Sequence, residues 1–126
     1  MTVRVLIVDD QEPFRLAARM VVEATDGFEV VGESETGEGS VVAAKELDPD
    51  LVLMDIQLPG MNSIEALACL RADEATRDIP VVAVTASVTI QDQSQITRAG
   101  FDAFISKPIN LKEFLATVNA FVGKAE

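Results

Sequence analysis

The sequence predicts an α/β fold in which a five-stranded parallel sheet is doubly wound, with helices on both of its faces. Short aliphatic runs alternate five times with segments of helical periodicity, and some runs are apolar at every position. The chain has 126 residues, of which 48% are hydrophobic, so its size matches one ordinary globular domain. We therefore expect a single domain over residues 1–126, without an output domain.

The predicted strands are β-branched or aliphatic runs, each followed by a polar turn. They span residues 3–8, 28–32, 51–54, 81–84 and 103–105. The sequences VLIV at 5–8 and LVLM at 51–54 are apolar at consecutive positions, which indicates burial on both faces of the sheet. The alternation of strands with helices implies right-handed crossovers and a parallel sheet.

Helices are predicted where apolar residues recur at helical spacing on one face. These residues are Phe14, Ala17, Ala18, Val21 and Val22; Val41, Val42, Ala44 and Leu47; Ile64, Leu67, Ala68 and Leu70; and Leu111, Phe114, Leu115, Val118, Phe121 and Val122. Gly27, Pro49, Gly100 and Gly123 are typical stop signals, and Pro13 suits a first helical turn.

The fourth helix has a weak pattern. Residues 89–99 contain only Ile90 and Ile96 as large apolar residues, so we expect a mobile helix there.

Composition excludes several classes of function. Ten Lys and Arg against 21 Asp and Glu give a net charge of −11, which disfavours direct binding to nucleic acids and membranes. The chain has one cysteine and no histidine, so it lacks the usual ligands of zinc, copper and haem. A hard cation held by carboxylates is still compatible with the composition. Cys69 is predicted to be a small buried hydrophobe on its helix. Without a signal-peptide core or a membrane-length apolar stretch, the sequence predicts a cytoplasmic protein.

Polar residues stand at the carboxyl ends of four predicted strands, where ligands bind in an open parallel sheet. Asp9 and Asp10 follow the first strand, Asp55 the third, Thr85 the fourth and Lys107 the fifth. Three carboxylates brought together would repel by about 4 kcal/mol per close pair, so Mg²⁺ and the lysine ammonium are expected to compensate. Asp55 is then the candidate nucleophile that attacks phosphorus, while Lys107 and Thr85 hold phosphoryl oxygens.

Each of these residues also has a structural interpretation. Asp9 and Asp10 would cap a helix, Asp55 would open a turn, and Thr85 would bond to the backbone. Their coincidence at one end of four strands favours the chemical interpretation. The glycines in residues 32–39 do not predict a phosphate loop, because three glutamates line the segment and no Lys-Ser/Thr follows. A flavin or dinucleotide site is disfavoured by the acids after the first strand.

Four ordered motifs resemble the receiver domain of two-component response regulators. They are LIVDD at 6–10, LVLMDIQLPGM at 51–61, VVAVTA at 81–86 and FISKP at 104–108, and the resemblance covers essentially the whole chain. It implies a flavodoxin-like (CheY-like) sheet with strand order 2-1-3-4-5 and five helices.

The resemblance implies a phosphoacceptor and a metal site. Asp55 matches the residue that takes a phosphoryl group from a phosphohistidine on a sensor histidine kinase or a histidine phosphotransfer protein. Asp9 (through a water), Asp10, Asp55 and the backbone carbonyl of Gln57 match the ligands of Mg²⁺, for which Mn²⁺ is a substitute. A receiver of this kind catalyses its own phosphorylation and slow dephosphorylation but is primarily a signalling switch.

The resemblance also implies the parts of the switch. Thr85 matches the switch hydroxyl, Lys107 the phosphate-contacting lysine, Phe104 the aromatic whose rotation reports phosphorylation, and Lys107–Pro108 a cis peptide. Charge on Asp55 would draw Thr85 and Lys107 inward, Phe104 would enter the vacated space, and the fourth helix would repack to alter docking of a downstream protein. Dimerisation through the fourth and fifth elements stays open.

One departure and two alternatives remain. Asn62–Ser63 stands where many receivers have Asp-Gly, a change that would alter the loop flanking Asp55 and the lifetime of the phosphorylated state. A pseudo-receiver, an interaction module that works without phosphate, is the main alternative. An Asp-nucleophile phosphatase ranks last, because it would need an acid at Gln57 and a substrate cap.

Overall fold

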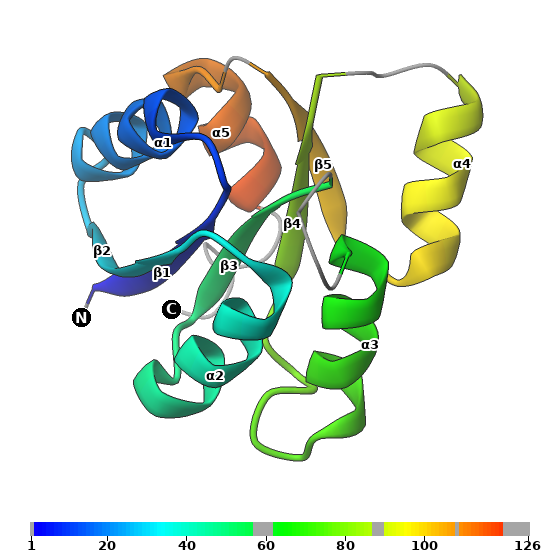
Figure 1. Ribbon diagram of the computed structural model, residues 1–126. Coiled ribbons are helices and arrows are strands. Elements are labelled where there is room, and N and C mark those ends of the chain that lie inside the picture. Colours follow the sequence, from blue (N-terminus) through cyan, green and yellow to red (C-terminus); the bar gives the residue numbers. More distant parts are fainter. Residues whose placement is uncertain (1, 57–61, 87–89, 108, 120–126) are drawn as a thin grey trace.

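The computed structural model describes residues 2–56, 62–86, 90–107 and 109–119, except the side chains of residues 90 and 92. Five strands alternate with five helices, as the sequence predicts (Figure 1). The strands are β1 (Val3–Val8), β2 (Phe28–Ser34), β3 (Leu51–Asp55), β4 (Val81–Thr85) and β5 (Ala103–Ser106). The helices are α1 (Glu12–Glu23), α2 (Gly37–Leu47), α3 (Ser63–Ala72), α4 (Ile90–Ala99) and α5 (Leu111–Val118).

The sheet has the order β2-β1-β3-β4-β5, and all neighbouring strands run parallel, which confirms the predicted topology. The chain first moves outward from β1 to β2, then returns to β3 on the other side of β1. This reversal opens a crevice at the carboxyl ends of β1 and β3, the usual place for a ligand in such sheets.

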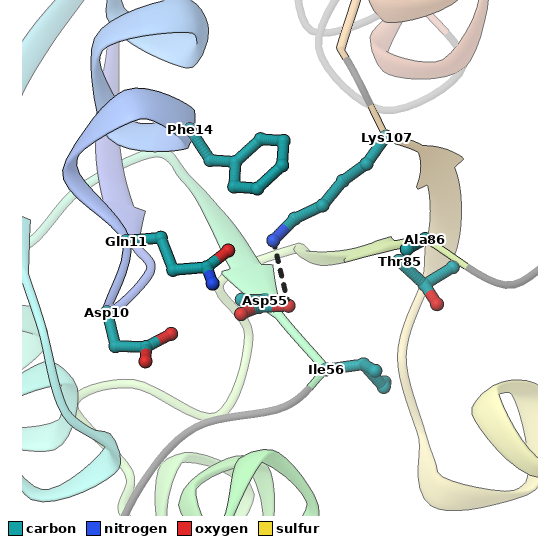
Figure 2. Close-up of a pocket in the computed structure, with 8 residues that line it drawn as sticks. All are labelled: Asp10, Gln11, Phe14, Asp55, Ile56, Thr85, Ala86 and Lys107. Carbon is teal, nitrogen blue, oxygen red and sulfur yellow. Dashed lines mark ion pairs between the residues drawn. The ribbon is translucent and has the colours of Figure 1, made fainter.

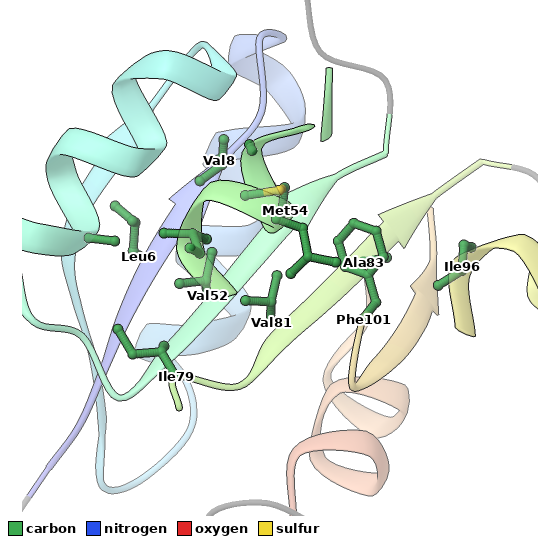
Figure 3. Packing of buried hydrophobic residues seen from close by; sticks show 13 residues of the cluster. Leu6, Val8, Val52, Met54, Ile79, Val81, Ala83, Ile96 and Phe101 are labelled. Carbon is green, nitrogen blue, oxygen red and sulfur yellow. The ribbon is translucent and has the colours of Figure 1, made fainter. Parts of the chain in front are cut away.

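The sheet is covered on both faces, as expected from the apolar runs. Figure 1 shows α1 and α5 over one face, and α2, α3 and α4 over the other. Successive strand residues point to opposite faces, so Val5 and Ile7 join the cluster under α1 and α5, while Leu6 and Val8 join the opposite one. Figure 3 shows this second cluster.

Several strands are longer than the apolar pattern indicates. β2 extends to Ser34, two residues beyond the prediction, and Asp55, Thr85 and Ser106 are the last residues of their strands. Backbone pairing continues through these positions, with Asp55 opposite Val84 and Thr85 opposite Ser106. Asp55 and Thr85 therefore belong to the sheet, whereas Asp9, Asp10 and Lys107 follow the ends of β1 and β5.

The predicted helix faces are partly wrong. α3 buries Ser63, Ala66, Leu67 and Leu70, so its apolar face is centred on these positions, whereas Ile64 is 53% exposed. Ala68 is exposed as well. On α2, Ala44 is buried but Val42 is 56% exposed.

Cys69 is exposed, so its prediction as a buried hydrophobe is wrong. It lies between the buried positions 66 and 70 in sequence, but the 3.6-residue turn places it on the flank of α3.

Start and stop signals act largely as predicted. Pro13 lies in the first turn of α1. Gly27 and Gly100 precede β2 and β5 with φ of 85° and 107°, a conformation that favours glycine. α4 forms over the expected range and buries Ile96, while its predicted mobility stays a prediction. Within the described segments, no helix has the length and apolar character needed to cross a membrane.

Candidate functional site

The parallel register brings the predicted site residues to one edge of the sheet. Val8 pairs with Met54, Asp55 with Val84 and Thr85 with Ser106, so the carboxyl ends of β1, β3, β4 and β5 lie in a row. The residues that follow β1 and β5 continue into the same space. Figure 2 shows Asp10, Asp55, Thr85 and Lys107 around this space, while Asp9 is not drawn there.

Three carboxylates form a cluster at this edge. Asp9, Asp10 and Asp55 each offer an oxygen, and these oxygens lie within 4.8 Å of one another. Asp9 and Asp55 are only 4% and 5% exposed, whereas Asp10 is exposed. A set of closely spaced oxygen donors, partly open to solvent, fits a hard divalent cation that keeps some of its waters. Gln57, whose carbonyl the resemblance adds to the ligands, lies outside the described residues.

Lys107 is the cation of this cluster. Its Nζ lies 3.0 Å from Asp9 Oδ2 and 3.3 Å from Asp55 Oδ1, and its side chain is 8% exposed. The Lys107 backbone N–H donates to the Thr85 carbonyl at 2.8 Å, which fixes where the side chain leaves the end of β5. Among these described groups, three carboxylates and one ammonium leave two negative charges, which a divalent cation would neutralise.

The turn between β1 and α1 orients Asp9. The Asp9 backbone N–H donates to the Ser34 main-chain carbonyl at 3.0 Å. The Gln11 backbone N–H donates to Asp9 Oδ1 at 2.9 Å. Arg15 Nη1 donates to the Asp9 carbonyl at 2.9 Å, while its guanidinium pairs with Glu33. These bonds hold the Asp9 carboxylate toward the cluster.

A cavity of about 230 Å³ opens beside the cluster. Its lining consists of Asp10, Gln11, Phe14, Asp55, Ile56, Thr85, Ala86 and Lys107 (Figure 2). Thr85, which is buried at 3% exposure, lies across this cavity from Asp10. The site thus combines acids, an ammonium and a hydroxyl around one space, the composition predicted from the strand ends.

Comparison with known proteins identifies the family. Residues 5–119 match the model of the response regulator receiver domain. The chain belongs to this family. Receiver domains act in two-component signalling, where they interact with histidine kinases or phosphotransfer proteins and with downstream targets.

Individual relatives agree with this assignment. The polar-differentiation response regulator DivK of Brucella ovis is 40% identical over 125 residues, which cover 99% of this chain and 100% of that protein. The response regulator domain of Thermotoga maritima CheB is 30% identical, with a TM-score of 0.77 over 95% of this chain and 91% of that one.

A further structure supports the fold. The receiver domain of a sensor histidine kinase from Pseudomonas aeruginosa is 24% identical, with a TM-score of 0.86 over 98% of this chain and 99% of that one. That structure holds a magnesium ion in its active-site cleft.

The predicted switch aromatic of this receiver lies apart from the cavity. Phe104 is half-buried on β5 and packs against the cluster that contains Ile96 and Phe101, on the face covered by α4. Phe104 is not one of the described residues that line the cavity. The predicted cis peptide at Lys107–Pro108 lies outside the described residues, because Pro108 is not among them.

The receiver site contains residues that the sequence reasoning did not assign to it. Gln11, Phe14, Ile56 and Ala86 also line the cavity, and the Phe14 ring centroid lies 4.1 Å from Lys107 Nζ. Phe14 was expected only as part of an apolar helix face. Its place in the first turn of α1, one short turn after Asp9 and Asp10, is the signal that would have assigned it to this edge of the sheet.

The Asn62–Ser63 departure has a structural role. Asn62 Oδ1 accepts from the Glu65 N–H at 2.9 Å, and the Asn62 N–H donates to Glu65 Oε1 at 3.2 Å, which completes a capping box on α3. The Ser63 hydroxyl is buried and donates to the main-chain carbonyl of Asp55. This pair therefore ties the start of α3 to the end of β3. The predicted effect on the flanking loop lies outside the described residues.

Proposed function

We propose that this receiver takes a phosphoryl group onto Asp55 in a Mg²⁺-dependent reaction. The donor is a phosphohistidine on a partner histidine kinase or histidine phosphotransfer protein. The observation that carries the proposal is the convergence of Asp55 with Asp9 and Asp10 within 4.8 Å, next to the ammonium of Lys107. No other described group of acids combines such proximity with a buried lysine and a cavity.

The proposed step is a direct transfer. A carboxylate oxygen of Asp55 forms a bond to phosphorus while the phosphorus–nitrogen bond of the donor breaks and its electron pair returns to the imidazole. Asp9 (through a water), Asp10, Asp55 and the carbonyl of Gln57 are the proposed holders of Mg²⁺, with Mn²⁺ as a substitute. When bound, the ion neutralises charge on the phosphoryl oxygens.

Lys107 and Thr85 are the proposed partners of the transferred group. The ammonium is already 3.3 Å from Asp55, so it reaches a phosphoryl oxygen with a small movement of a long side chain. Thr85 lines the same cavity and offers a hydroxyl from the end of β4. Their movement toward the phosphoryl group is the proposed trigger of the switch.

Phe104 is the proposed link between the site and the outer surface. It lies on β5, three residues before Lys107, and packs against the cluster that holds α4 through Ile96. A rotation of Phe104 therefore reaches both the Thr85 region and the contact of α4 with β5. We propose that the surface formed by α4, β5 and α5 docks the downstream target, while dimerisation through it stays a prediction.

We also propose that residues 1–126 form a single receiver domain that signals by docking to a protein target. The relative from Brucella ovis, named for polar differentiation, aligns over 100% of its length with 99% of this chain. We propose that the protein acts in the cytoplasm, as the sequence predicts.

Small-molecule phosphorylation tests this function. The folded chain, incubated with Mg²⁺ and acetyl phosphate, is expected to gain one phosphoryl group by intact-mass spectrometry. Asp55→Asn should abolish the gain, whereas Asp26→Asn, an exposed acid away from the cavity, should not. A folded, metal-loaded wild-type chain that stays unmodified would overturn the proposal and favour the pseudo-receiver.

A further inference from the structure

Lys107 has a third contact besides the two carboxylates. Its Nζ lies 4.1 Å from the centroid of the Phe14 ring, well within the range of a cation–π interaction. Figure 2 shows the ring and the ammonium on the same side of the cavity, above Asp55. We propose that Phe14 is a positioning residue for Lys107: its ring holds the ammonium over Asp55. This inference rests on the proposed role of Lys107 in phosphoryl transfer.

The fold fixes the backbone of Phe14 close to the site. α1 begins at Glu12, and the backbone N–H groups of Phe14 and Arg15 both donate to the Gln11 carbonyl, each at 3.1 Å. Phe14 is therefore held in the first turn of α1, next to the acid pair.

Apolar side chains support both partners. Phe14 and Lys107 together border a second, small cavity with Ile7, Val84 and Ile109. The aliphatic stem of Lys107 lies beside these apolar groups, while its charged end reaches the carboxylates. Only 8% of the Lys107 side chain is exposed, and burial of the lysine strengthens the attraction of its ammonium to the ring face.

The ring differs from the carboxylates in one respect. Asp9 and Asp55 are proposed metal ligands, so their hold on the ammonium weakens when they share their charge with a divalent cation. Among the described contacts of the ammonium, the Phe14 ring is the one for which no metal competes. It therefore keeps the ammonium in place at the stage at which a phosphoryl oxygen must be received, when a preorganised donor contributes most.

The geometry is tested first in metal-free protein. NMR spectra of a ¹³C-lysine-labelled sample should show the ε-methylene signals of Lys107 shifted upfield by the ring current of Phe14. In Phe14→Leu these signals should return to the range of the other lysines, and Phe14→Tyr should restore the shift. Unshifted Lys107 signals in the wild type would overturn the inference, whatever the protein does with phosphate.

The contribution to phosphoryl transfer is tested by changing the ring's electronics at constant shape. Phenylalanine carrying one, two or three fluorines at position 14 should slow modification by acetyl phosphate stepwise at saturating Mg²⁺. The largest loss should be about two- to thirtyfold, as for removal of one cation–π contact. Phe14→Tyr should keep the wild-type rate within about twofold.

A matched control separates electronics from packing. The same fluorinated residues at Phe28, which stacks edge-on against Phe114 at 5.5 Å, should leave the rate unchanged. If the fluorinated Phe14 variants react at the wild-type rate, the inference fails while the proposed function stands. If the wild-type chain is not modified at all, the proposed function fails, and the metal-free NMR result alone decides on the ring.

Discussion

Lys107 determines the electrostatics of the site, because it is the buried cation between two buried acids. Removing one partner of such a cluster leaves the remaining charges close together in a poorly solvated place. Lysine also suits this role by its shape, since a point charge on a flexible stem can shift from a carboxylate to a nearby anion. If Lys107 has the role proposed above, stability and phosphoryl transfer depend on the same ammonium.

Lys107→Met tests this double role. In the absence of Mg²⁺ the free energy of unfolding should fall by about 3 kcal/mol, because Asp9 and Asp55 lose the charge between them. Urea unfolding followed by circular dichroism measures the loss, and millimolar MgCl₂ should restore more stability to the variant than to the wild type. Lys112→Met, at an exposed position of α5, should behave like the wild type. Equal stabilities of the two variants would contradict the account.

Ser63 acts on Asp55 through the backbone. Ser63→Ala removes the hydroxyl that donates to the Asp55 carbonyl, so the free energy of unfolding should fall by about 1 kcal/mol, up to about 3 if the carbonyl stays buried without a donor. Urea unfolding compares it with Ser94→Ala, an exposed position of α4. Identical midpoints for the two variants would show that the Ser63 bond contributes nothing.

At the level of elements, the strands were predicted by their apolar runs but not to their ends. The apolar runs end at Met54 and Val84, whereas backbone pairing between strands continues through Asp55 and Thr85. The reason is physical: pairing depends on the backbone of the neighbouring strand, and the polar side chains are tolerated because they point into the site. Apolar patterning therefore underestimates the length of strands that end in polar residues.

Helix faces were harder to predict than strands. In α2 and α3, small residues such as Ala44, Ser63 and Ala66 take buried positions, while Val42 and Ile64 stay exposed. The spacing of large apolar residues therefore misplaced the buried face by part of a turn. Phe14 was missed as a site residue for a related reason, since an aromatic in an apolar stripe is ordinarily core.

An ion pair connects α2 with the end of α3. Lys45 Nζ lies 2.8 Å from Asp73 Oδ2, and both side chains are partly exposed. The hydrogen bond from Lys45, followed by one from the Ala75 N–H, lowers the pKa of Asp73 below its ordinary value. The hydrogen bond to Asp73 in turn raises the pKa of Lys45.

The direction of these shifts predicts a pH dependence. Because the folded-state pKa of Asp73 is lowered, its contribution to stability is present above the unfolded-state pKa and is lost as the pH falls through the folded-state value. The wild type should therefore be more stable than Asp73→Asn at neutral pH, by a small margin typical of exposed pairs. Urea midpoints measured down to acidic pH should converge. A difference that stays constant into acid would contradict the assignment.

For the whole molecule, topology assembles the site. Asp9, Asp55 and Lys107 are separated by tens of residues, and the β2-β1-β3-β4-β5 order places their strand ends in one crevice. Strand alternation and the four motifs were sufficient to predict that order and the residues that converge. They were not sufficient to predict that Lys107 pairs with Asp9 as well as Asp55, or that a ring covers its ammonium, because such contacts depend on side-chain packing.

Chemical trapping shows which residue of the chain carries the phosphoryl group. After reaction with Mg²⁺ and acetyl phosphate, reduction with borohydride converts an aspartyl phosphate to homoserine, which peptide mass spectrometry locates. Homoserine is expected at position 55 and nowhere else. Homoserine at position 9 or 10, or an unconverted aspartate at 55 in folded and metal-loaded protein, would contradict it.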